Sequence, residues 1–234
     1  MGNYLDFLAL YGIGGAHPGG ILLTKELLYR ETISDSMSVL DIGCGTGQTA
    51  AFIKEMFGSR VVGLENHPVM LEKARKRMQA EGFNVELIEG SAESMPFDDQ
   101  EFDFIISESV LSFVDKKAVL SEAHRVLKSG GVLIAVEMTA EGEIANENKD
   151  EVTNFYGVQY LLKEEEWRKC TEEAGFSMVE IESPDFPLLS PEPVIEFNLS
   201  EVIPEEIHEM LDRHEEYLAK YKDLLGVRII RCIK

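Results

Sequence analysis

The sequence predicts an α/β fold whose central sheet is mostly parallel and is covered by helices on both faces. One observation is that short β-branched runs alternate with helical patterns from Ser38 to about Ile134, an order typical of β-α-β units. A second is that runs such as VVGL, FIIS and VLIAV are apolar at every position, as expected of strands buried on both sides. The length of 234 residues fits one such domain with insertions.

The N-terminal residues predict two helices that are joined by a loop. The first helix covers Tyr4 to Tyr11, and the residues from Gly12 to Gly20 have the glycine and proline density of an irregular loop. A second helix follows, because Leu23 and Leu27 recur at helical spacing. We expect residues 1–32 to form a cap on the domain.

Residues 38–138 form the predicted core of the fold. The strand candidates are SVLDIG, RVVGLE, NVELIEG, FDFIIS and GGVLIAVEM, in chain order. Helical patterns between them end at Phe57, extend from Pro68 to about Ala80, and extend from about Lys117 to Leu127. Parallel strands end at one edge of a sheet, which is where folds of this class bind their ligands.

The C-terminal part has a different character. An acidic, asparagine-rich linker is predicted from Ala140 to Glu151, followed by a helix from Leu162 to Ala174 and the strand FSMVEIE. Residues 184–225 are a predicted helical insertion before the last strand, GVRIIRCIK. The insertion opens with prolines at Pro184, Pro187, Pro191 and Pro193. One face of its helix is predicted to carry Ile207, Met210, Leu211, Tyr217, Leu218, Tyr221 and Leu224.

The composition disfavours several classes of function. A formal net charge of -21 repels polyanions, and nucleic-acid binding needs clustered cations. The basic run from Lys73 to Met78 is expected to be a solvated helix face. The sequence contains no apolar run long enough to span a bilayer and no basic start of a secretory signal. Cys44, Cys170 and Cys232 are widely separated, as reduced thiols of a cytoplasmic protein are. We therefore expect a cytoplasmic protein, and the charge and the lack of a membrane-spanning run predict that it binds neither nucleic acid nor membranes.

The motif VLDIGCGTGQTAAF places Gly43, Gly45 and Gly47 between a predicted strand and a predicted helix. Glycine allows the positive φ angles of a tight turn and a close approach of the backbone to a ligand. The free N–H groups at the start of the helix can then face that ligand. A dinucleotide fingerprint requires a third glycine where Gln48 stands, and a phosphate-binding loop requires a Lys-Ser/Thr pair that is absent.

Acidic residues stand at the ends of neighbouring strands. Asp41 precedes the glycine turn, and Glu65 ends the second strand about 20 residues on, where an acid can accept hydrogen bonds from ribose hydroxyl groups. The third strand ends before Ser91, Ala92 and Glu93, which could meet an adenine edge. These strand ends predict one nucleoside site at the carboxyl edge of the sheet.

These motifs resemble the class I S-adenosylmethionine-dependent methyltransferases. DIGCGTG, Glu65, GSAESMPFDDQEFDFI and HRVLKSGGVLIAVE carry the resemblance from Ser38 to Met138. They are similar in detail to the small-molecule enzymes that methylate ubiquinone and menaquinone precursors. The resemblance implies a Rossmann-like fold with a seven-stranded sheet, an antiparallel last strand from Val227 to Ile233, and helical insertions over the site. It also implies S-adenosylmethionine as cofactor and a small-molecule acceptor that the sequence does not identify.

The resemblance implies roles for individual residues as well. Glu93 and Glu65 stand where the family commonly has Asp, and Glu keeps the same hydrogen-bond acceptors. Ser107, at the end of the fourth strand, would hold the amino-acid end of the cofactor. Asp41, Gly43, Gly45 and Gln48 would meet its methionine portion, Glu65 and Asn66 its ribose and adenine surroundings, Met70 would flank the adenine, and Ala92 and Glu93 would contact the base.

Methyl transfer from a sulfonium is an in-line displacement, so the enzyme mainly positions the reactants and excludes water. A base is needed only if the nucleophile arrives protonated. Glu108, after the fourth strand, and His17, in the glycine-rich loop, are the catalytic candidates. The alternatives are a solvated or helix-capping carboxylate and a turn-stabilising histidine. His208 and His214 fall on different helix faces, and we expect no metal site.

Other functions remain open at this point. A non-catalytic module that binds S-adenosylmethionine is the main alternative, although the intact glycine turn and acids favour an enzyme. A nicotinamide oxidoreductase is disfavoured by Gln48. Tyr156 and Tyr160 are either acceptor-pocket or core residues. We predict that the insertion 184–225 covers the acceptor and not the cofactor, and the oligomeric state is unknown.

Overall fold

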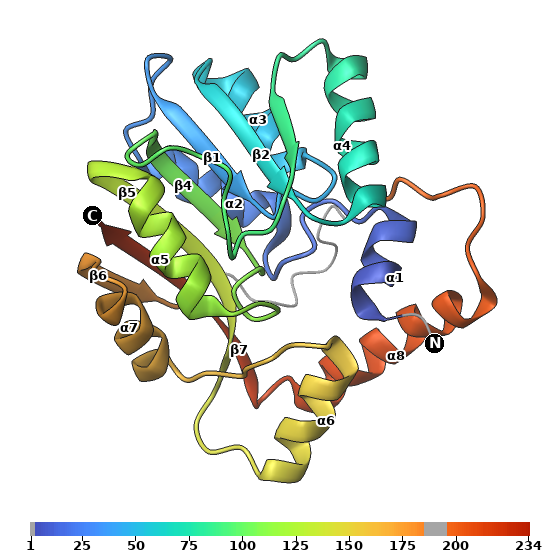
Figure 1. The fold of residues 1–234 in the computed structure, drawn as a ribbon. Coiled ribbons are helices and arrows are strands. Elements are labelled where there is room, and N and C mark those ends of the chain that lie inside the picture. Colours follow the sequence, from blue (N-terminus) through green and yellow to red (C-terminus); the bar gives the residue numbers. More distant parts are fainter. Residues whose placement is uncertain (1–2, 185–195) are drawn as a thin grey trace.

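The computed structural model describes residues 3–184 and 196–234, and a seven-stranded sheet forms the centre of this part (Figure 1). The strand order is β3-β2-β1-β4-β5-β7-β6. β1 pairs in parallel with β2 and β4, and β7 runs antiparallel between β5 and β6, which confirms the predicted fold class. The strands are β1 Ser38–Ile42, β2 Arg60–Glu65, β3 Glu86–Glu89, β4 Phe102–Glu108, β5 Leu127–Ala140, β6 Ser177–Glu182 and β7 Leu225–Ile233.

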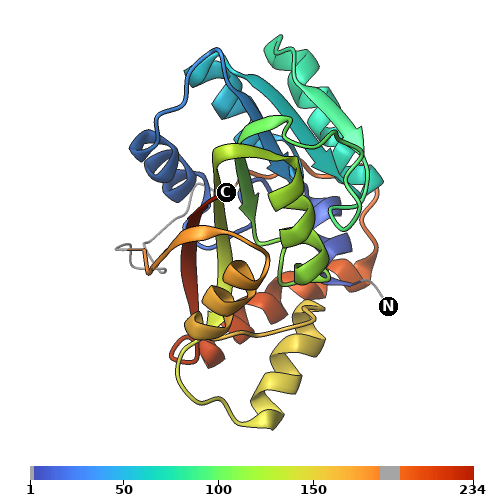
Figure 2. The same ribbon diagram turned by 60° about the vertical axis from the view of Figure 1, so that its left-hand side comes forward.

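Helices lie on both faces of the sheet and at one of its ends (Figures 1 and 2). α5 and α7 pack on one face, and α2 and α3 pack on the other. α1, α6 and α8 gather beyond one end of the strands. The helices are α1 Tyr4–Tyr11, α2 Gly20–Arg30, α3 Gln48–Phe57, α4 Pro68–Glu81, α5 Lys116–Val126, α6 Asn146–Tyr156, α7 Glu164–Glu173 and α8 Glu205–Tyr221.

The two faces of the sheet have separate cores because side chains alternate along a strand. Leu40 and Ile42 of β1 belong to the cluster formed with α5 and α7, which includes the fully buried Trp167. Val39 belongs to the opposite cluster, formed with α2 and α3. Full burial of such an apolar side chain contributes about 1.5–3 kcal/mol. A register slip would turn these side chains to the wrong face, so the alternation fixes the pairing of the central strands.

A third cluster, built from α1, α6 and α8, is rich in aromatic rings. Tyr4 of α1, Tyr156 of α6 and Tyr221 of α8 are all buried in it. Ala140, the last residue of β5, belongs to the same cluster. The cluster therefore lies at the carboxyl edge of the parallel strands, which is the edge that carries the glycine turn.

The structure differs from the sequence prediction after β5. The linker predicted from Ala140 to Glu151 is wrong, because α6 begins inside it at Asn146. Buried side chains in α6 are confined to its C-terminal part, at Val152, Phe155 and Tyr156. Its first turns are polar, and this hides the helical periodicity.

Two further predictions concern the C-terminal insertion. Leu218 is 41% exposed, so it does not belong to the apolar face predicted for α8. Pro187, Pro191 and Pro193 lie outside the described residues. No helix in the described ranges is long and apolar enough to cross a membrane.

Candidate cofactor and acceptor site

The glycine turn connects the end of β1 to the start of α3. Gly43 and Gly45 have φ angles of 67° and 54°, a region that L side chains rarely adopt. A Cβ at Gly43 would lie 2.4 Å from Cγ2 of Val110, whereas a Cβ at Gly45 would meet nothing closer than Sδ of Met70 at 3.9 Å. Gly43 is therefore required by packing, and Gly45 faces open space beside Met70.

Glu65, at the end of β2, is tied to this turn. Its Oε2 accepts a hydrogen bond from the backbone N–H of Gly45 at 2.9 Å, and its Oε1 accepts one from the N–H of His67 at 2.7 Å. Glu65 is 8% exposed. Each carboxylate oxygen has two lone pairs, so both oxygens keep capacity for a further donor.

Four buried oxygen atoms around the turn have no hydrogen-bond partner among the described residues. They are Oδ2 of Asp41, Oγ1 of Thr46, Oε1 of Gln48 and Oγ of Ser107. Such atoms are rare, because most buried polar groups are paired. Burial, with smaller contributions from the charges of Glu108 and Glu65, raises the pKa of Asp41 well above its ordinary value. A positively charged ligand group bound here would offset that cost.

The two catalytic candidates lie against each other. Nε2 of His17 is 3.1 Å from Oε1 of Glu108, and both side chains are almost completely buried. Thr24 of α2 is hydrogen-bonded to both: its Oγ1 lies 3.0 Å from Nε2 of His17 and donates to Oε1 of Glu108. Thr49 of α3 donates to Oε2 of Glu108 at 2.7 Å. Sequence reasoning missed both threonines, because a single Thr in a helix carries no distinctive signal.

The polar atoms of both catalytic candidates already make hydrogen bonds within this cluster. Both oxygens of Glu108 accept hydrogen bonds, and Nδ1 of His17 lies 3.2 Å from the carbonyl oxygen of Pro18. In this arrangement the cluster fastens the loop of residues 12–20 to β4 and α3. The catalytic role of His17 and Glu108 therefore stays a prediction.

The start of the described C-terminal segment also reaches the glycine turn. Oε2 of Glu196 accepts a hydrogen bond from Nε2 of Gln48 at 2.8 Å, and the backbone N–H of Gly14 donates to the Glu196 carbonyl at 3.1 Å. Oε1 of Glu196 pairs with Arg77 at 2.7 Å. At Glu196 the insertion 184–225 therefore contacts Gln48, a predicted cofactor residue, and the assignment of the insertion to the acceptor stays a prediction.

Two residues of the basic run of α4 make hydrogen bonds to other elements, which the sequence analysis did not predict. Lys73 is 6% exposed, and its Nζ donates to the carbonyl oxygens of Leu10, at 3.0 Å, and of Asn198. Nε of Arg77 donates to the Thr46 carbonyl at 2.9 Å. The predicted solvated face is therefore wrong at these two positions, where α4 supports the N-terminal cap and the glycine turn.

Comparison with known proteins decides the family. The family described as "Methyltransferase domain" matches residues 33–175. The uncharacterized methyltransferase YodH of Bacillus subtilis is 36% identical over 226 residues, which cover 97% of each chain. The chain belongs to this methyltransferase family. Its methyl donor is S-adenosylmethionine, as the sequence resemblance implied.

More distant proteins share the fold or part of the sequence. A demethylmenaquinone methyltransferase of Chlorobaculum tepidum is 40% identical over 100 residues, covering 42% of this chain and 40% of its own. The structure of Haemonchus contortus phosphoethanolamine N-methyltransferase 2 in complex with S-adenosyl-L-methionine superposes with a TM-score of 0.80. That match has 19% identity and covers 99% of this chain and 56% of the other, so it supports the fold alone.

The unpaired atoms of the methyltransferase fit this cofactor. S-adenosylmethionine carries an ammonium and a sulfonium charge, and the buried carboxyl of Asp41 has an oxygen without a partner beside the glycine turn. Thr46, Gln48 and Ser107 add three unpaired oxygens that can meet the donors of an amino-acid group. The residues present therefore suit the polar end of the cofactor.

The other predicted cofactor residues lie on the outer side of the site. Asn66 and Glu93 are exposed and Ala92 is half-buried. Oε1 of Glu93 accepts a hydrogen bond from the backbone N–H of Asp115 at 2.7 Å. The structure therefore leaves Asn66 and Glu93 accessible to solvent, near the ends of β2 and β3.

Glu137 is a buried acid that the sequence analysis missed. It is 0% exposed, and it accepts hydrogen bonds from the N–H groups of Val110 at 3.0 Å, Leu111 at 2.8 Å and Ser112 at 3.2 Å, and from Oγ of Ser112 at 2.8 Å. Burial raises its pKa to about 7, against the opposing effect of these hydrogen bonds. Glu137 holds the loop that follows β4. A lone acid in the apolar run VLIAVEM was the available signal.

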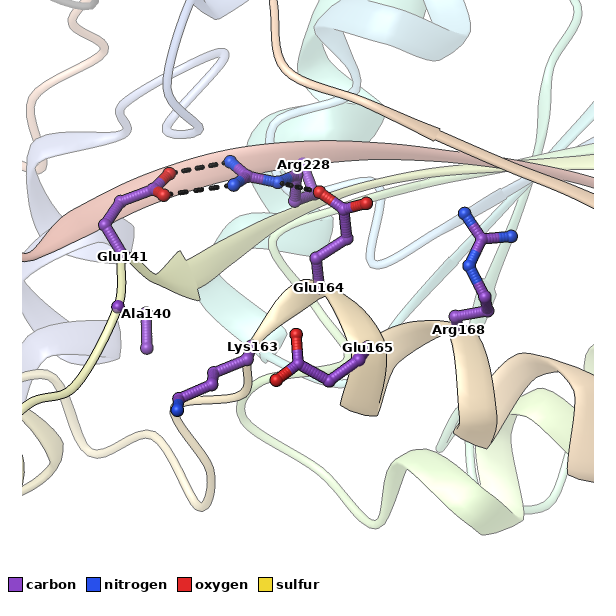
Figure 3. A pocket seen from close by; sticks show the side chains of 8 residues that line it. Ala140, Glu141, Lys163, Glu164, Glu165, Arg168 and Arg228 are labelled. Carbon is purple, nitrogen blue, oxygen red and sulfur yellow. Dashed lines mark hydrogen bonds and ion pairs between the residues drawn. The ribbon is translucent and has the colours of Figure 1, made fainter.

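A cavity of about 450 Å³ lies elsewhere, between the end of β5 and the start of α7 (Figure 3). Arg228 donates to both carboxylate oxygens of Glu141, at 2.7 and 3.0 Å, and to Glu164 at 2.9 Å. None of the predicted cofactor residues lines this cavity. Since its charges largely neutralise each other, we do not assign the active site to it. No group of His, Cys, Asp and Glu in the described ranges is arranged to hold a metal ion.

Proposed function

We propose that this methyltransferase methylates a small molecule that lies between the glycine turn and the aromatic cluster of α1, α6 and α8. The observation that carries the proposal is the set of unpaired buried oxygens at the turn, with the aromatic cluster at the same edge of the sheet. Bound S-adenosylmethionine supplies an electrophilic methyl group on a sulfonium. The formal net charge of -21 disfavours polyanionic acceptors such as nucleic acids.

The proposed cofactor contacts follow from where the side chains lie. Asp41 and Ser107 hold the ammonium end, and Gln48 with the backbone at Gly43 and Gly45 lies along the methionine portion. Glu65 accepts from the ribose hydroxyls with the lone pairs left free by Gly45 and His67. Met70, Asn66, Ala92 and Glu93 surround the base.

The chain's own residues act mainly by position. Burial of Asp41, Glu65 and Ser107 excludes water from the site, which strengthens their electrostatic interactions. Glu108 and His17 remain the candidate proton acceptors for an acceptor that arrives protonated. Thr24 and Thr49 donate to the two oxygens of Glu108, which orients the carboxylate and leaves Oε2 a second lone pair that can take a proton.

The activities named for related proteins support a small acceptor. They include a sterol 24-C-methyltransferase of Yarrowia lipolytica, 31% identical over 161 residues that cover 65% of this chain and 42% of its own, and the demethylmenaquinone methyltransferase of Chlorobaculum tepidum. We also propose a cytoplasmic location without membrane or nucleic-acid partners, supported by three free cysteines and the acidic composition.

A methyl-transfer screen with labelled S-adenosylmethionine tests the proposal. We expect product with at least one phenol, amine, thiol or quinone precursor. Glu108→Gln should lower turnover of a protonated acceptor while affinity for S-adenosylhomocysteine stays the same, and Glu55→Gln, at an exposed position of α3, should change neither. Unchanged turnover in Glu108→Gln would remove Glu108 from the mechanism. Failure of Asp41→Asn to weaken cofactor binding would move the cofactor away from this edge.

A further inference from the structure

Tyr156 and His214 stand out in the aromatic cluster because each has a buried polar atom without a hydrogen-bond partner in the described ranges. The hydroxyl of Tyr156 and Nδ1 of His214 are buried and have no hydrogen-bond partner among the described residues. Tyr156 is 2% exposed. The two rings meet edge to face with centroids 5.7 Å apart, and Tyr4 of α1 contacts both, with centroids 4.9 and 5.4 Å away. Two polar atoms without described hydrogen-bond partners thus lie within a group of three aromatic side chains that contact one another.

A neighbouring pair shows that the same helices can satisfy such groups. The hydroxyl of Tyr11 on α1 is hydrogen-bonded to Nδ1 of His208 on α8, with 2.7 Å between the atoms. His208 and His214 lie on the same helix, yet only His208 has a tyrosine partner. A buried polar group without a partner costs stability, so the open pair of Tyr156 and His214 is best explained by a ligand that completes it.

Both groups are uncharged at neutral pH. Burial raises the pKa of Tyr156, and burial lowers the pKa of His214. The charged neighbours of His214 along α8, Arg213 and Glu215, are exposed, and the guanidinium of Arg213 lies over the Phe155 ring, 4.9 Å from its centroid. A phosphate or a carboxylate would find no buried countercharge here, whereas a hydroxyl or carbonyl group would find two hydrogen-bond partners.

We propose that Tyr156 and His214 form the subsite that hydrogen-bonds the single hydroxyl or carbonyl group of an otherwise apolar, ring-containing acceptor. Tyr4 and its aromatic neighbours contact the ring of that acceptor. Met70 belongs to the same cluster as Tyr4 and borders the glycine turn at Gly45, which connects the subsite to the cofactor side. This inference rests on the proposed function, and it names the class of acceptor.

Matched probes test the subsite without turnover. Phenol and benzene differ by one hydroxyl group, and their affinities can be measured by ligand-observed NMR titration in the presence of S-adenosylhomocysteine. In the wild-type protein we expect phenol to bind about tenfold more tightly than benzene, the equivalent of one well-formed hydrogen bond. In Tyr156→Phe and in His214→Phe the ratio should fall toward one. Tyr29→Phe, at a 57% exposed tyrosine of α2, is the control and should keep the wild-type ratio.

The stability of the ligand-free protein provides a second readout. Because Tyr156→Phe removes an unpaired buried hydroxyl, it should raise Tm by about 2–4 °C, while Tyr29→Phe leaves Tm unchanged. Equal affinities of phenol and benzene in the wild-type protein, a ratio that persists in both ring variants, or tight binding of phosphoethanolamine would each overturn the inference. Titration with S-adenosylhomocysteine alone reports separately on the proposed function, since its failure would concern the cofactor site and not this subsite.

Discussion

Glu137 offers a quantitative test of how the loop after β4 is held. Its pKa in the folded protein is about 7, against an ordinary value of 4.5, because it is completely buried. The folded protein therefore binds this proton more tightly than the unfolded chain does. The resulting stabilisation is fully present below pH 4.5 and is lost as the pH rises through 7. At about 1.4 kcal/mol per pKa unit, the loss approaches about 3 kcal/mol.

The perturbation is Glu137→Gln, which removes the titration and keeps one hydrogen-bond acceptor. Urea denaturation at pH 5 and pH 8 should show that the wild-type protein loses about 2–3 kcal/mol more stability over this interval than the variant does. Glu172→Gln, at an exposed position of α7, should follow the wild-type protein. The same pH dependence in the wild-type protein and Glu137→Gln would refute the reasoning, because the buried carboxyl would then titrate as it does in the unfolded chain.

Three other substitutions test the turn and the His17 cluster. Gly43→Ala should destabilise the fold by about 2–4 kcal/mol, because its Cβ would meet Val110 at a positive φ angle; urea denaturation measures this, and a full wild-type midpoint would contradict it. Glu65→Ala should weaken binding of S-adenosylhomocysteine by about 10- to 100-fold in titration calorimetry, and equal affinity would remove Glu65 from the site. Thr49→Val should lower the free energy of unfolding, measured by urea denaturation, by about 1–3 kcal/mol, because Oε2 of Glu108 loses its hydrogen-bond donor. Thr49→Ser keeps that hydroxyl donor and should retain the wild-type stability.

The sequence predicted the sheet and the glycine turn because their signals are local. Apolar runs such as FIIS define central strands on their own, and the spacing of Asp41, Gly43 and Glu65 follows from one β-α-β unit. The antiparallel last strand came from the family resemblance and not from the residues. The structure brings these elements to one edge, as parallel pairing requires.

The remaining features depend on contacts between distant residues. α6 was missed because its polar first turns conceal buried side chains at its end. The meeting of His17 with Glu108 through Thr24 depends on how the N-terminal loop folds over β4, and no spacing in the chain encodes that. The open pair of Tyr156 and His214 likewise appears only when α6 packs against α8.

The central claim is that the edge formed by β1, β2 and β4 binds S-adenosylmethionine. Stabilisation of the fold by the cofactor tests this claim most directly. A ligand at 100 times its Kd adds about 2.7 kcal/mol, which corresponds to a rise in Tm of about 5–10 °C for a chain of this size. We expect this rise with S-adenosylmethionine and S-adenosylhomocysteine, a much smaller one in Glu65→Ala, and none with NAD. A Tm that is unchanged by millimolar S-adenosylmethionine, or that rises with NAD instead, would contradict the account.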